Sequence, residues 1–212
     1  MQKIYADTQA LYKRIDHTIE VHFDKQKTQA PCGKGCASCC SQFFEISELE
    51  FTIIAQHLNQ LPADEQATIA KRASDLFASF QDHWPSFYEA FFTPKTIHLH
   101  TDAYYQHKDR YKVVMPCVFL SDEGSCTIYQ KRPIICRTTG VAYQHLFNPG
   151  AVCNVIRHGL LTPLWQADLR PFAHEINAIR WLADDSNPLG VKRQYPMFYY
   201  CFDLLVNKKS LT

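Results

Sequence analysis

The chain has 212 residues, of which 46% are hydrophobic, 20% charged and 13% aromatic, with a formal net charge of +1 at pH 7. This length and composition suit a chain with a buried core and exclude wholesale disorder. The near-neutral charge gives no general attraction to nucleic acid or to an anionic membrane, so we expect neither as a partner.

Charged side chains are scattered through residues 1–20, so this stretch predicts neither a secretory signal peptide nor a membrane anchor. We find no window near the roughly eighteen consecutive apolar residues that a membrane-spanning helix needs. We therefore expect a cytoplasmic protein, in which thiols are kept reduced. Nine cysteines in such a compartment need a reason, and metal binding is the commonest one.

Helical periodicity and helix start signals recur along the chain. They predict helices over residues 2–27, 47–60, 62–80, 85–92 and 171–183, and a short helix after Pro133. The second of these begins at Ser47, which is spaced from Glu50 as in a capping box. Short extended pieces are predicted at 94–101, 113–120 and 126–129, and a turn at 122–124. We expect a mostly α fold with short extended segments, forming a single domain over residues 1–212.

Eight of the nine cysteines form two rows in the sequence. The first row is Cys32, Cys36, Cys39 and Cys40, and the second is Cys117, Cys126, Cys136 and Cys153. Short cysteine spacings let thiolates on one tight turn point at the same ion. Eight thiolates suit two zinc sites, a bridged pair of ions, or one iron–sulfur cluster with spare thiols. We expect the two rows to meet around metal, which then staples the domain together.

The adjacent pair Cys39-Cys40 bears on the number of metals. Consecutive side chains diverge by about 100° on a helix and about 180° on a strand. The two thiols therefore face two metals, or one faces metal and the other faces the core. This divergence favours a polynuclear or two-site arrangement over a single zinc ion.

Cysteines can also be present for reasons that do not involve metal. Buried cysteine behaves as a small apolar residue, which is our interpretation of Cys201 within its aromatic run, and a disulfide framework is a further alternative. The spacing from Cys32 through Cys36 to Cys39 also matches that of radical S-adenosylmethionine enzymes. Those enzymes place the motif in a βα barrel, and we see no alternation of strands and helices here.

The motifs around the cysteines carry a family resemblance. They are the first row itself, Pro116-Cys117-Val118-Phe119-Leu120, Cys126-Thr127-Ile128-Tyr129 and Arg132-Pro133-Ile134-Ile135-Cys136-Arg137. In order and flanking residues the chain resembles the YkgJ-like cysteine-cluster family of zinc- or iron-chelating proteins (CxxCxxCC). The likeness covers a core of about residues 32–153, although the first gap here is three residues where family members often have two.

The resemblance implies a metal-chelating domain with zinc or iron, and most members of the family have no assigned activity. We therefore expect a metal-binding protein whose cofactor is zinc or an iron–sulfur cluster. One alternative is a metalloenzyme that uses the centre for redox or Lewis-acid chemistry. A related motif occurs in the flagellin lysine methylases, which are longer, so protein lysine methylation is a distant option for such an enzyme. Another alternative is a zinc-stapled interaction module.

Arginines and histidines supply further candidates for the site. Arg132 and Arg137 flank Cys136, where a guanidinium either offsets the charge of a thiolate cluster or forms an ion pair with an acid. The secondary ligand candidates are histidines, namely His98, His100, His145 and His158.

Overall fold

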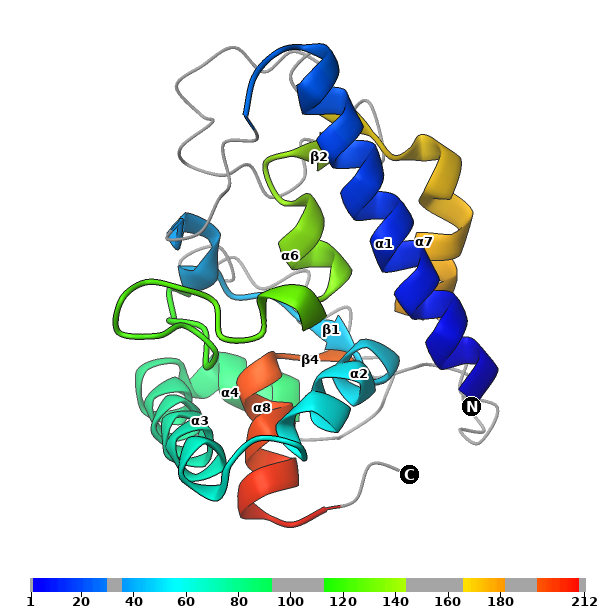
Figure 1. Ribbon diagram of the computed structural model, residues 1–212. Coiled ribbons are helices and arrows are strands. Elements are labelled where there is room, and N and C mark those ends of the chain that lie inside the picture. Colours follow the sequence, from blue (N-terminus) through cyan, green and yellow to red (C-terminus); the bar gives the residue numbers. More distant parts are fainter. Residues whose placement is uncertain (1, 30–35, 93–112, 144–165, 182–193, 210–212) are drawn as a thin grey trace. The chain divides into compact units, whose positions relative to one another are not determined.

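The computed structural model describes residues 2–29, 36–92, 113–143, 166–181 and 194–209 (Figure 1). The chain divides into two compact units, each made of two segments. Unit 1 comprises residues 1–39 and 120–180, and unit 2 comprises residues 40–119 and 181–212. One boundary therefore passes between Cys39 and Cys40. The expectation of a single domain stays a prediction.

Unit 1 is built on the long helix α1 (Gln2–Lys25), which the sequence predicts to within two residues. Leu11, Ile15, Ile19 and Phe23 recur every fourth residue and are buried, so they form the apolar stripe of an amphipathic helix. Helix α1 contacts the short helix α6 (Ile134–Thr138) and strand β3 (Ala167–Asp168).

The remaining elements of unit 1 are short. Strand β2 (Ala142–Tyr143) pairs with β3 in parallel. The 3₁₀ turns η3 (Tyr129–Lys131) and η4 (Arg170–Phe172) precede α6 and α7 (Ala173–Trp181). Helix α7 lies beside α1 (Figure 1), where Arg14 forms an exposed ion pair with Glu175.

Unit 2 begins within η1 (Ser38–Ser41), a 3₁₀ turn that carries both Cys39 and Cys40. Strand β1 (Ile46–Ser47) pairs antiparallel with β4 (Gln194–Tyr195) and leads into helix α2 (Glu48–Leu58). The predicted capping box is present: the Ser47 hydroxyl accepts from the Glu50 N–H, and the Glu50 carboxylate accepts from the Ser47 N–H. Because two otherwise unpaired donors are satisfied together, the helix start is fixed at this residue.

The core of unit 2 is aromatic. Helices α3 (Ala63–His83) and α4 (Pro85–Phe92) are followed, after residues that are not described, by α8 (Met197–Cys201) and the π-helical turn η5 (Phe202–Val206). Helix α3 contacts α8 and η5. Phe80 is fully buried, with its ring centroid 5.3 Å from that of Phe43 and 5.8 Å from that of Phe198. Rings at these separations contribute beyond their buried area, so aromatic packing accounts for much of this core.

The mostly helical fold class is confirmed, and the predicted helices are present within the described residues. Two extended pieces are wrong. Residues 113–120 form only isolated bridges, from Val114 to Gln42 and from Leu120 to Cys126. Pro116 has no N–H to donate to a neighbouring strand. Val118 is buried, but it is not part of a sheet.

The second wrong piece is residues 126–129, where Cys126 makes a bridge and a turn then leads into η3. The predicted turn at 122–124 is present, with Gly124 at a φ of 73° that favours glycine. The extended piece predicted at 94–101 lies outside the described residues. None of the helices in the described ranges is long and apolar enough to cross a membrane.

Candidate metal centre

Four cysteines of unit 1 are described, and they come from both rows. Cys36 and Cys39 lie at the end of its first segment, Cys126 in the bridge with Leu120, and Cys136 on α6. All four are half-buried, and none of the four is in a disulfide.

Cys126 links the two rows electrostatically. Burial raises the pKa of its thiol, a hydrogen bond from the Ile128 backbone and the positive charge of Arg132 lower it, and the charge of Cys39 raises it again. Cys39 therefore lies close enough to Cys126 for one thiolate to disfavour the other. A cation bound between two such thiolates removes this repulsion, because it favours the deprotonated form of both.

In unit 2 the backbone of Cys40 lies beside that of Cys117, a cysteine of the second row. The Cys117 N–H donates to the carbonyl oxygen of Cys40 at 2.6 Å, and the Met115 N–H donates to that of Ser41 at 3.0 Å. These bonds hold the chain from Cys40 to Gln42 alongside the chain from Val114 to Cys117. Both cysteines are half-buried.

Cys201 differs from the other cysteines. It lies on α8 with none of its surface exposed. Burial raises the pKa of its thiol well above the ordinary range, and the charge of Cys117 adds to this effect. The side chain is therefore kept neutral in the core of unit 2, as expected for a small apolar residue.

The two arginines beside Cys136 have different surroundings. Arg137 is buried, and each of its three nitrogens donates: Nη1 to the Asp16 carboxylate, Nε to the Arg132 carbonyl at 2.8 Å and Nη2 to the Gln130 carbonyl at 2.8 Å. Its guanidinium also lies 4.4 Å from the ring centroid of Tyr12. Arg137 therefore forms the buried ion pair that was one of its two predicted roles.

Sequence reasoning did not single out Asp16 as the partner of these arginines. Its carboxylate accepts from Arg137 and lies 3.7 Å from Nη2 of Arg132. The available signal was its position one turn after Tyr12, next to the apolar stripe of α1. A carboxylate there needs a cation when the helix packs.

The structure thus distributes the predicted ligands unevenly. Cys36, Cys39, Cys126 and Cys136 are in unit 1, and Cys40 and Cys117 are in unit 2. Cys32 and Cys153 lie outside the described residues, as do His98, His100, His145 and His158. Within the described ranges, no three cysteine, histidine or acidic side chains are grouped closely enough to hold a metal ion. The chemistry of the thiol donors nevertheless fits zinc or iron.

Comparison with known proteins identifies one family. The family model CxxCxxCC, described as "Putative zinc- or iron-chelating domain", matches residues 31–154. Neither the curated proteins nor the solved structures contain a match to the chain. The match covers more than half of the chain and includes both cysteine rows, so the metal-chelating class expected from the motifs is confirmed. The chain belongs to the CxxCxxCC family of zinc- or iron-chelating domains.

Proposed function

We propose that this protein binds zinc or an iron–sulfur centre in the cytoplasm through the eight cysteines of its two rows. The observation that carries the proposal is the electrostatic interaction by which the charge of Cys39 raises the pKa of the Cys126 thiol within unit 1. These residues are far apart in sequence, so the interaction depends on the fold of unit 1. Family membership supplies the choice of metals.

The metal has a structural role in this proposal. The segments that carry Cys36, Cys117 and Cys126 have no regular strand or α-helix in the described structure. Ordering such segments costs roughly 1–2 kcal/mol per residue in backbone entropy. Metal–thiolate bonds offset this cost, so part of the metal-binding free energy becomes folding free energy.

The adjacent pair supports more than one metal position. Consecutive side chains on a 3₁₀ turn diverge by about 120°, because the turn has three residues per revolution. Cys39 interacts with Cys126 in unit 1, whereas Cys40 is bonded through its backbone to Cys117 in unit 2. Cys39 and Cys40 thus have different second-row neighbours, one through charge and one through the backbone, which favours separate metal positions over one ion shared by both.

Anaerobic purification followed by metal and sulfide analysis tests this function. Colourless protein with about two zinc ions per chain identifies zinc sites of four thiolates each. Brown protein with iron and acid-labile sulfide identifies a cluster. Less than one metal ion per chain after anaerobic handling would contradict the proposal.

A metalloenzyme is the second candidate, and one observation favours it. Cys117 lines a small pocket of unit 2 together with Met115, Val118 and Phe198, among other mostly apolar side chains. A metal bound at Cys117 would adjoin this pocket, where a small apolar group could meet it. Loss of metal-dependent activity on Val118→Trp, with metal content unchanged, is the result expected of an enzyme that uses this pocket. A test for activity should include both redox and hydrolytic reactions.

A further inference from the structure

The two arginines that flank Cys136 differ in their hydrogen bonds. Each of the three nitrogens of Arg137 donates to a protein acceptor, so its guanidinium is held by the fold of unit 1. Arg132 accepts one of these bonds through its carbonyl oxygen. The side chains of the two arginines both interact with Asp16.

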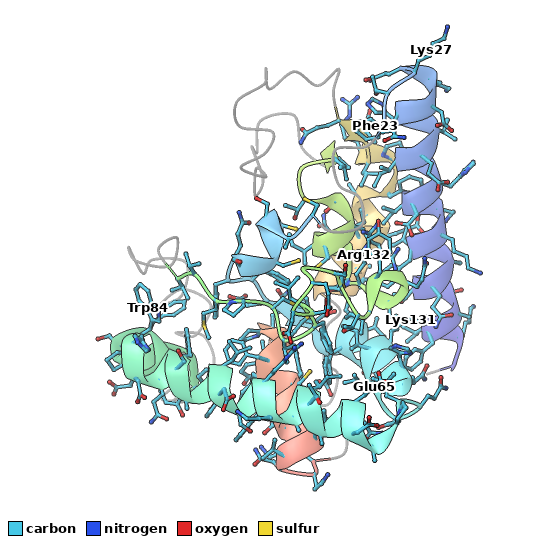
Figure 2. All side chains as sticks on the ribbon, turned by 60° about the vertical axis from the view of Figure 1, so that its left-hand side comes forward. Phe23, Lys27, Glu65, Trp84, Lys131 and Arg132 are labelled. Carbon is cyan, nitrogen blue, oxygen red and sulfur yellow. The ribbon has the colours of Figure 1, made fainter. Side chains whose placement is uncertain are left out.

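The Arg132 guanidinium is held in position but not satisfied. It stacks 3.9 Å from the ring centroid of Tyr129, and its Nη2 lies 3.7 Å from Oδ1 of Asp16, which is an ion pair too long for a hydrogen bond. Its Nε is buried and has no hydrogen-bond partner in the part of the chain that the structure describes. Figure 2 shows Arg132 next to α1, the helix that carries Asp16. A buried donor without an acceptor costs about 1–3 kcal/mol.

A sulfur ligand lies within the electrostatic reach of this guanidinium. The charge of Arg132 acts on Cys126, and Arg132 lies between Cys126 and Cys136 in the chain. A metal-bound thiolate carries negative charge and accepts hydrogen bonds. Such a thiolate at Cys126 would supply the acceptor that Nε lacks.

We propose that Arg132 is a positioning residue of the metal centre, donating its Nε–H to the metal-bound thiolate of Cys126. Tyr129 and Asp16 hold the guanidinium plane in place for this bond. The inference rests on the proposed metal binding of unit 1 and assigns different tasks to the two arginines. Arg132 stabilises the centre, and Arg137 stabilises the fold around it. Groups that orient metal ligands in this way typically change metal affinity by about 10–100-fold.

The test uses the full chain loaded with Co²⁺, whose thiolate-to-metal charge-transfer band reports on electron density at sulfur. Removal of a hydrogen bond to a thiolate raises its electron density and moves the band to lower energy. We expect Arg132→Met to show this shift and to bind Co²⁺ and Zn²⁺ about 10–100-fold more weakly in competition with a chelator. Arg132→Lys keeps the charge without the planar fork, so we expect it to restore affinity only in part.

Two further variants serve as controls. Arg170→Met removes an exposed arginine of unit 1 that pairs with Asp168, and we expect wild-type affinity and an unshifted band. Arg137→Lys should unfold at a lower urea concentration than the wild type, while the folded variant keeps the wild-type position of the charge-transfer band. If Arg132→Met does not fold, the position of the charge-transfer band in Arg132→Lys provides the test of the role of Arg132.

The outcomes separate the two proposals. An unshifted band with affinity within about twofold of wild type in the folded Arg132 variants would overturn the role of Arg132 and leave metal binding intact. Wild-type protein that takes up no Co²⁺ or Zn²⁺ would overturn the proposed function itself. An equal shift in Arg170→Met would also contradict the inference, because it would show a general charge effect.

Discussion

The backbone N–H of Cys117 donates to the carbonyl oxygen of Cys40 across 2.6 Å, which joins the end of the first cysteine row to the start of the second. In unit 1 the charge of Cys39 acts on Cys126, which belongs to the second row. Each member of the adjacent cysteine pair therefore has a second-row neighbour in its own unit. This relationship is the structural basis for proposing that both rows bind metal.

The Cys39–Cys126 relationship gives a prediction about non-additive metal loss. We expect Cys39→Ser and Cys126→Ser each to release metal, because serine is a poor ligand for zinc or iron in a thiolate site. The double variant should lose little more than either single variant, because both thiols serve one site. Metal per chain, measured at matched protein concentration, provides the comparison.

Cys136→Ser should release metal and lower solubility in the same way, whereas Cys201→Ser should keep its metal. Cys201 is fully buried on α8 and is interpreted as a core thiol. Equal metal loss in Cys201→Ser and Cys136→Ser would show that the exclusion of Cys201 from the ligands is wrong.

The capping box of α2 predicts a change in stability that does not involve metal. Ser47→Ala removes the acceptor for the Glu50 N–H and should lower the free energy of unfolding by about 1 kcal/mol. Thr68→Ala is the matched control, because the Thr68 hydroxyl only bonds the Asp64 carbonyl within an exposed stretch of α3. Urea denaturation should show a loss for Ser47→Ala and a change within about 0.5 kcal/mol for Thr68→Ala. Equal losses would contradict the role of the cap.

Tyr200 predicts how stability changes at alkaline pH. Burial raises its pKa well above the ordinary value, and the negative charge of Glu48 adds to this. An unfolded tyrosine ionises near pH 10, so the folded chain holds this proton to a higher pH than the unfolded chain. The stabilisation is complete below about pH 10 and is lost as pH rises toward the folded pKa, by at most about 1.4 kcal/mol per pH unit.

Tyr200→Phe keeps the ring, which stacks on Phe51 at a centroid distance of 4.7 Å, but cannot ionise. We expect its unfolding free energy to fall less steeply above pH 10 than that of the wild type. At pH 7 the variant should lose about 1 kcal/mol, because its ring lacks the hydroxyl that bonds the Ile46 carbonyl at 3.4 Å and the Tyr195 backbone. Parallel slopes for wild type and Tyr200→Phe would refute this assignment.

Local signals predicted the helices well, and tertiary context decided the rest. Ser47 and Glu50 satisfy each other within four residues, so the start of α2 is readable from sequence. The run around Val118 reads as a strand because it is apolar, yet its burial comes from loop packing rather than from a ladder. Burial alone does not distinguish these cases.

The family was predicted from the cysteine motifs and their flanking residues. The meeting of the two rows around metal stays a prediction, which the charge interaction of Cys39 with Cys126 supports. The separate tasks of Arg132 and Arg137 could not be predicted, because they depend on Asp16, which lies on a helix distant in sequence. Flanking motifs indicate the presence of an arginine near a cysteine but not which acceptors its nitrogens reach.

The most direct test of the central claim is X-ray absorption spectroscopy of the anaerobically purified protein at the edge of its bound metal. Ligation by the cysteine rows predicts a first shell dominated by about four sulfur atoms at roughly 2.3 Å for zinc. An iron–sulfur cluster predicts a sulfur shell with a further iron neighbour. A first shell made only of nitrogen and oxygen would contradict the claim that these cysteines hold the metal.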